Sequence, residues 1–212
     1  MTWGRMQNPI RGLLHGSAAV AAAIGLGFLL SRSRGVTPWP AAALFGFALV
    51  AMFTVSALYH SVPWTERWRE RIRRVDHSLI FIVVAATFTP LAFAALEGVA
   101  LAVGLTLVWG VAAVGIVLKM VLRRPRVGLS VLLQMVMGWS ALIWLPRFAS
   151  RLGWEAVALI LAGGACYTVG TVVFATRRPR LAPRVFSHHE LFHVLVVAGA
   201  LFHFWAVAGY AI

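Results

Sequence analysis

The chain has 212 residues, of which 61% are hydrophobic and only 12% are charged, and its mean hydropathy is +0.86. Soluble domains carry about 25% charged residues, so this composition excludes an ordinary soluble domain and predicts an all-α integral membrane protein. The net charge of +13 does not indicate nucleic-acid binding, because the basic residues lie in short loops between apolar runs. A single cysteine, Cys166, excludes both an intrachain disulfide and a cysteine metal site.

Seven apolar runs are long enough to cross a bilayer, which takes about 20 residues in each helix. The first run is too long for the core of a typical signal peptide, so we expect it to remain in the protein. Pro90 lies inside the third run and predicts a kink there, with Thr87 or Thr89 bonding the freed carbonyl. The sequence therefore predicts one seven-transmembrane helix bundle over residues 1–212, with spans at about 12–31, 38–61, 76–95, 99–122, 127–146, 155–175 and 190–211.

The basic residues predict which way this bundle faces. Fifteen of the 19 fall on one side of the predicted topology, namely Arg5, Arg11, Arg67, Arg69, Arg71, Arg73, Arg74, Lys119, Arg123, Arg124, Arg126, Arg177, Arg178, Arg180 and Arg184. The other four, on the opposite side, are Arg32, Arg34, Arg147 and Arg151. By the positive-inside rule we expect a cytoplasmic N-terminus and, after seven spans, a C-terminus outside. All basic residues but Lys119 are arginine, which is typical of GC-rich bacterial genomes, so we expect a multi-pass protein of the inner (plasma) membrane.

Six of the seven histidines fall at the cytoplasmic level of this topology, together with Asp76, the only aspartate. They are His15, His60, His77, His188, His189 and His193. Ionisable side chains within a membrane are costly and usually face the bundle interior or a cavity. His203 lies about 15 Å deeper than His193, since each helical residue rises 1.5 Å. We expect it to line the cavity or to bond another helix.

The spacing of these residues indicates a metal site. His189 and His193 are four residues apart and share one face of a helix, as do Ser56 and His60. Two imidazoles from the seventh span and a third from the second span leave the fourth position of a tetrahedral site for water, with the Asp76 carboxylate as the partner of that water. Such a donor set predicts Zn²⁺, although other divalent ions also accept it.

Other interpretations of single residues remain open. For His15, His77 and His188 an interfacial position at a helix end is the simpler explanation, and Ser56 is explained as well by a bond to the carbonyl four residues earlier. Residues 189–193 read H-E-L-F-H, the HExxH pattern of zinc metalloproteases, in which Glu190 would be the general base. That pattern opens the last span, however, and leaves little chain after it for a third ligand.

Four stretches together resemble the hemolysin III family, which belongs with the adiponectin and progestin receptors and, more distantly, the alkaline ceramidases. They are SALYHS (56–61), RVDHSLIFIVVAATFTPLAF (74–93), CYTVGTVVFATRRPR (166–180) and SHHELFHVLVVAGALFHF (187–204). Their joint pattern is Ser-x-x-x-His ending the second span, Asp opening the third and His-x-x-x-His opening the seventh. The resemblance extends from about residue 9 to residue 208.

The resemblance implies seven helices with a cytoplasmic N-terminus. It also implies His60, His189 and His193 as zinc ligands, Asp76 as the partner of the zinc-bound water, and Ser56 as its support. Many bacterial members carry a Glu and an Asn just before the histidine of the first span. Here Arg11 stands four residues before His15 and Asn8 precedes Pro9, so the resemblance gives His15 no role.

Three functions fit these observations. The first is a zinc-dependent hydrolase of lipid amides such as ceramide, with Asp76 as general base and membrane lipids as substrate or ligand. The second is a non-enzymatic membrane sensor or effector, in which zinc is structural and Asp76 binds it directly. The third is a pore-forming hemolysin, which the absence of a long amphipathic segment outside the spans disfavours. Neither the substrate nor the oligomeric state follows from the sequence.

Overall fold

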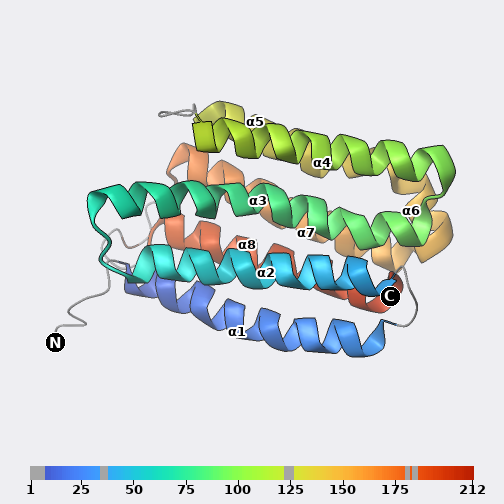
Figure 1. The fold of residues 1–212 in the computed structure, drawn as a ribbon, viewed down its shortest axis with the longest axis horizontal. Coiled ribbons are helices and arrows are strands. Elements are labelled where there is room, and N and C mark those ends of the chain that lie inside the picture. Colours follow the sequence, from blue (N-terminus) through green and yellow to red (C-terminus); the bar gives the residue numbers. More distant parts are fainter. Residues whose placement is uncertain (1–7, 34–37, 122–126, 180–181, 183–185) are drawn as a thin grey trace.

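Nine helical elements make up the part of the chain that the computed structural model describes, which is residues 8–33, 38–121, 127–179, 182 and 186–212. They are α1 (Pro9–Arg32), α2 (Pro38–Ser61), α3 (Glu66–Ala95), α4 (Gly98–Val121), α5 (Val127–Trp139), the 3-10 helix η1 (Ser140–Trp144), α6 (Leu145–Leu152), α7 (Trp154–Thr176) and α8 (His188–Tyr210). The long helices lie side by side and alternate in direction, so that α1 begins and α2 ends at the same end of the bundle (Figure 1). We call this the N-terminal end.

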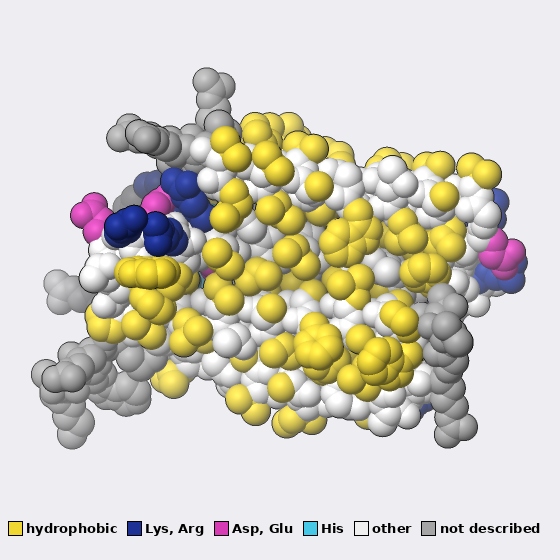
Figure 2. Space-filling view, viewed as in Figure 1, with side chains coloured by type: hydrophobic (Ala, Val, Ile, Leu, Met, Phe, Trp, Pro, Cys, Tyr) yellow, Lys and Arg dark blue, Asp and Glu magenta, His cyan; other side chains and the backbone are white. Residues whose placement is uncertain are grey.

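Seven crossings are long and apolar enough to span a membrane, which confirms the predicted all-α, multi-pass bundle. Hydrophobic side chains cover the middle of the face seen in Figure 2, and charged side chains gather toward the two ends of the molecule. This is the distribution that a bilayer requires of a multi-pass protein, which in bacteria lies in the plasma membrane. The predicted orientation stays a prediction, and it rests in part on residues outside the described ranges, namely Arg5, Arg34, Arg123, Arg124, Arg126, Arg180 and Arg184.

The third crossing begins ten residues earlier than the sequence predicted, because α3 starts at Glu66 and not near residue 76. The arginine-rich segment expected as a loop is helical. Glu70 accepts hydrogen bonds from Arg73 at 3.0 and 2.9 Å and from Arg74 at 3.0 Å. Pairs three and four residues apart stabilise an exposed helix, whereas hydropathy reveals only its apolar part.

The fifth crossing continues past Pro146, where the sequence predicted its end. α5, η1 and α6 together carry it to Leu152. Pro146 lies in the first turn of α6, where a backbone N–H would have no carbonyl partner within the helix. Proline is therefore tolerated at this position, and it begins a helix here and does not end one.

α3 lies at the centre of the bundle. Its most apolar stretch is 67% buried, which is more than in any other crossing. It contacts α2, α4, α5, α6 and α8. Ala85, Ala86 and Ala92 are fully buried, and such small side chains let neighbouring helices approach closely. α3 thus carries its polar residues into the interior of the bundle.

One local prediction about Pro90 was wrong. Thr87 and Thr89 do not bond the carbonyl that Pro90 frees, which belongs to the residue four positions earlier. Their hydroxyls donate instead to the carbonyls of Val83 and Ala85, at 2.7 and 2.8 Å. α3 continues through Pro90 as one helix.

Gly115 makes the close packing of α4 against α3 possible. A Cβ at this position would overlap the ring of Phe81, which is fully buried. We expect Gly115→Ala to lower the free energy of unfolding by about 1–3 kcal/mol, as overpacking does elsewhere. The matched control is Gly110→Ala in the same helix, where a Cβ meets nothing within 4 Å. Thermal unfolding of both variants in detergent tests this, and equal losses would contradict the packing argument.

Candidate metal centre

Three of the predicted site residues lie together at the N-terminal end of the bundle. His60 comes from the last turn of α2, and His189 and His193 come from the first two turns of α8. Each offers one ring nitrogen as a ligand atom, and these atoms all lie within 4.8 Å of one another. The ring centroids are 4.9 to 5.5 Å apart. The structure thus brings together the histidines that the sequence proposed as ligands.

The start of α8 is held by a capping box at Ser187. The Glu190 carboxylate accepts hydrogen bonds from the backbone N–H of Ser187 at 2.8 Å and from its hydroxyl at 2.6 Å. In turn, the backbone N–H of His189 donates to the Ser187 hydroxyl at 3.4 Å. Because this box satisfies the free amides of the first turn, it determines where the helix begins. Within that helix, the four-residue spacing places His189 and His193 on one face.

The three histidines suit a zinc ion by their chemistry. Three imidazoles with one position left open are the donor set of several catalytic zinc sites. Within the described residues, the rings of His60 and His189 have no hydrogen-bond partner, so their nitrogens are available to a metal. His193 uses Nδ1 in a hydrogen bond, which leaves Nε2 for a metal. The identity of the metal stays a prediction.

His15 has a closer relation to the candidate site than the sequence indicated. Its Nε2 lies 2.8 Å from Nδ1 of His193, and it is only 3% exposed, so it is not an interfacial group. Its ring also meets Phe53 edge-on at 5.2 Å between centroids. Zinc-binding histidines usually hydrogen-bond through the second ring nitrogen, which fixes the orientation of the ring. The shared depth of His15 and the other histidines was the available signal, and its contact with His193 required the packing of α1 against α8.

Asp76 and Ser56 face the same cavity as the three histidines. Both are buried, and the Ser56 hydroxyl lies beside the Asp76 carboxyl. Among the described residues, the group of mutually close ligand atoms contains the three histidines and does not contain Asp76. The Asp76 carboxyl group therefore lines the same cavity as the three histidines and lies outside their tight cluster.

The inner cavity measures about 420 Å³ and runs from the histidine cluster toward the other end of the bundle. Most of the side chains that line it are apolar, and Phe148 and Ile160 lie in its deeper part. His203 also lines it and donates from Nε2 to the carbonyl of Ile160 at 3.2 Å, as its predicted depth allowed. His77 lines the cavity as well, whereas His188 does not.

Comparison with known proteins identifies the family of the chain. A family model described as haemolysin-III related matches residues 4–204. The chain belongs to the haemolysin-III related family. It is 28% identical over 169 residues to the hemolysin-3 homolog of Bacillus subtilis (strain 168), covering 80% of this chain and 76% of that protein. It is 26% identical over 205 residues to hemolysin-3 of Bacillus cereus, covering 94% and 90%. Heptahelical transmembrane protein 4 of Arabidopsis thaliana is 30% identical over 197 residues, 82% of this chain and 49% of that protein.

Glu190 has a structural role in this member of the haemolysin-III related family. Besides capping α8, its carboxylate accepts a hydrogen bond from Nε of Arg11 at 2.6 Å, and this ion pair ties α1 to α8. The two side chains are 19% and 9% exposed, and Glu190 does not line the inner cavity. This placement argues against the protease interpretation of HExxH, in which the glutamate must face the metal.

We therefore expect Glu190→Ala to lower the free energy of unfolding by about 3 kcal/mol. The substitution leaves the Arg11 guanidinium without its carboxylate partner and removes the cap of α8. Zinc content at saturating zinc should stay unchanged. The control is Glu97→Ala, since Glu97 pairs with Arg151 at the opposite end but is 76% exposed, and such pairs contribute little. Thermal unfolding with metal analysis measures both quantities. If Glu190→Ala is instead as stable as the wild type but has lost a hydrolytic activity that the wild type shows, the protease interpretation is restored.

Proposed function

We propose that this protein is a zinc-dependent hydrolase that cleaves the amide bond of a membrane lipid. The observation that carries the proposal is a cluster of three histidines that shares a mostly apolar cavity with the only aspartate of the chain. His60, His189 and His193 would hold the ion. Zinc, when bound, supplies Lewis-acid chemistry and makes water acidic enough to react near neutral pH.

Asp76 is the general base in this proposal. Amide hydrolysis adds the oxygen of water to the acyl carbon, breaks the C–N bond and passes one proton to the departing nitrogen. A carboxylate beside the reacting atoms can take that proton and return it. Asp76 is the only aspartate in the chain, and the Ser56 hydroxyl beside it is placed to orient its carboxyl group.

The inner cavity supports a lipid as the substrate. Its wall is mostly apolar and continues from the histidine cluster past Phe148 to His203, so an acyl chain has room beyond the reacting bond. Binding pockets of this kind are mainly apolar with a few polar groups that orient the ligand. An apolar wall also suits an aqueous pore poorly.

The structural-zinc alternative makes a different demand on Asp76. A closed structural site has four protein ligands, so Asp76 would have to bind the metal directly. The tight cluster in the described residues contains three histidines only, which favours a site with an open position. We therefore prefer the hydrolase.

The test is hydrolysis by the purified protein loaded with zinc in nanodiscs. Ceramides and other N-acyl lipids are supplied, and released fatty acid is measured by mass spectrometry. We expect release that stops when a chelator removes zinc and resumes when zinc is restored. A protein that holds one zinc per chain and releases no fatty acid from any lipid amide would overturn the proposal.

A further inference from the structure

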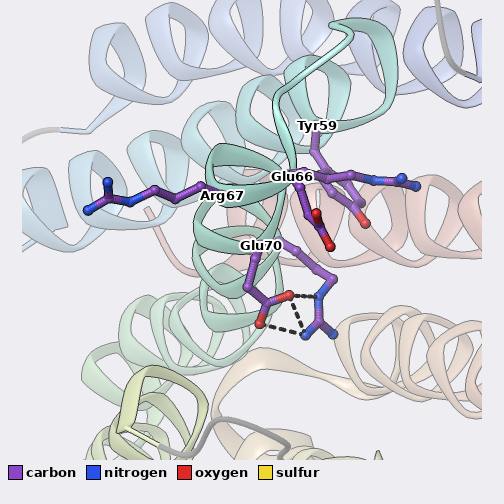
Figure 3. A pocket seen from close by; sticks show the side chains of 6 residues that line it. Tyr59, Glu66, Arg67 and Glu70 are labelled. Carbon is purple, nitrogen blue, oxygen red and sulfur yellow. Dashed lines mark hydrogen bonds and ion pairs between the residues drawn. The ribbon is translucent and has the colours of Figure 1, made fainter.

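A second hollow, the arginine cleft, adjoins the inner cavity at the N-terminal end of the bundle. It measures about 640 Å³ and is lined by Tyr59, Glu66, Arg67, Arg69, Glu70 and Arg73 (Figure 3). Tyr59 and Arg73 also line the inner cavity, so the two hollows meet at these residues. The junction lies on the same cavity as the histidine cluster and Asp76.

Lys119, on α4, lies near enough to Arg73 for the two charges to interact. It is the only lysine in the chain, lies in the last turn of α4, and lines the inner cavity together with Arg73. A lysine at the end of a membrane helix normally extends its ammonium into water, yet Lys119 is only 7% exposed. In the described part of the chain, no hydrogen bond or ion pair reaches its ammonium. The side chain of Lys119 is therefore mostly withdrawn from water, and an oxygen anion at this position would compensate its charge.

The nearby acidic groups are Glu66, Glu70 and Asp76, and none of them pairs with Lys119 among the described residues. The Glu70 carboxylate is shared between Arg73 and Arg74, and Figure 3 shows it facing a guanidinium on its own helix. Asp76 lies beside Ser56. Arg73 gives Glu70 only its Nε and one Nη hydrogen, so part of its five-donor guanidinium remains for another oxygen anion. The ammonium of Lys119 and the remaining donors of Arg73 are thus available to an oxygen anion at the junction.

We propose that Lys119 and Arg73, with the Tyr59 hydroxyl, bind the phosphate of a membrane phospholipid head group where the two hollows meet. Phosphate oxygens accept several charge-assisted hydrogen bonds at once, which suits an ammonium and a guanidinium side by side. The predicted topology places this junction at the level of the lipid phosphates of the inner leaflet. The proposal rests on the proposed function in one respect, since it makes the substrate a lipid amide that carries phosphate.

The single lysine permits a direct test on the intact, zinc-loaded protein. Amine-reactive labelling in neutral detergent reports on Lys119, and the terminal amine is resolved separately by peptide mass. We expect phosphatidylglycerol to slow labelling by about tenfold or more, the effect of a charged hydrogen bond. Diacylglycerol with the same acyl chains should have no such effect, and equal protection by both lipids overturns the proposal. Inorganic phosphate forms a third arm, and protection by it at matching concentrations assigns the anion site to free phosphate and not to a lipid.

Variants provide the second measurement. Lys119→Met keeps the length of the side chain and removes the charge, whereas Lys119→Arg keeps the charge. Native mass spectrometry should show a retained phospholipid in the wild type and in Lys119→Arg, reduced about tenfold in Lys119→Met. Arg151→Met is the control, because it removes an exposed cation at the opposite end. Thermal unfolding of each variant excludes loss of fold as the cause.

The two proposals fail in different ways. If Lys119→Met retains both zinc and phospholipid as the wild type does, the phosphate site is wrong and the hydrolase proposal stands. If phospholipid protects Lys119 but the zinc-loaded protein cleaves no lipid amide, the hydrolase is wrong and the phosphate site stands.

Discussion

Replacing His193 with alanine is expected to strip the protein of zinc. His193 is 2% exposed, lies within the cluster of three histidines, and is oriented by His15. Loss of an outer partner alone typically weakens metal binding about 10- to 100-fold, so loss of a ligand should weaken it by more than about 100-fold. Elemental analysis of the detergent-purified protein should find about one zinc per chain in the wild type and none in the variant.

His189→Ala and His188→Ala separate metal loss from damage to the fold. His189 is half-buried and belongs to the cluster, so its removal should also release the metal with less disturbance of packing. His188 is the neighbouring histidine, lies outside the cluster and does not line the inner cavity. His188→Ala should therefore keep its zinc. Equal metal content in all four proteins would show that these histidines only bond helices to one another.

Asp76→Asn is expected to give the opposite combination, with zinc retained and hydrolysis lost. The substitution keeps the size of the side chain and removes its capacity to accept a proton. General bases contribute about 10²- to 10⁴-fold to rate, so release of fatty acid should fall by that factor. The measurement is the rate of lipid amide cleavage per bound zinc.

Metal analysis of the same variant decides between the two roles of Asp76. Retention of zinc identifies Asp76 as a group that acts on water beside the metal. Loss of zinc in parallel with His193→Ala would make Asp76 a direct ligand and would favour the structural-zinc alternative. Ser56→Ala provides a graded comparison, because it removes the hydroxyl beside the carboxyl and leaves the carboxylate in place.

The sequence by itself determined the number and nature of the crossings and the set of candidate ligands. Seven runs of sufficient length can satisfy their backbone groups in lipid only as helices, so hydropathy alone predicts the bundle. The four-residue spacing of His189 and His193 places them on one helix face wherever the helix packs. Because alternating spans bring their ends to two levels, the order of the spans also assigns His60 and Asp76 to the level of these histidines.

Only the tertiary structure decided how the helices present these groups to one another. The contact of His15 with His193 and the ion pair of Arg11 with Glu190 join residues about 180 positions apart, and both depend on α1 packing against α8. The helical start of α3 depends on charge pairs that a hydropathy profile does not register. The burial of Lys119 depends equally on neighbours from another helix. Periodicity and hydropathy are properties of one segment, whereas the partner of a polar side chain is set by the packing of segments distant in the chain.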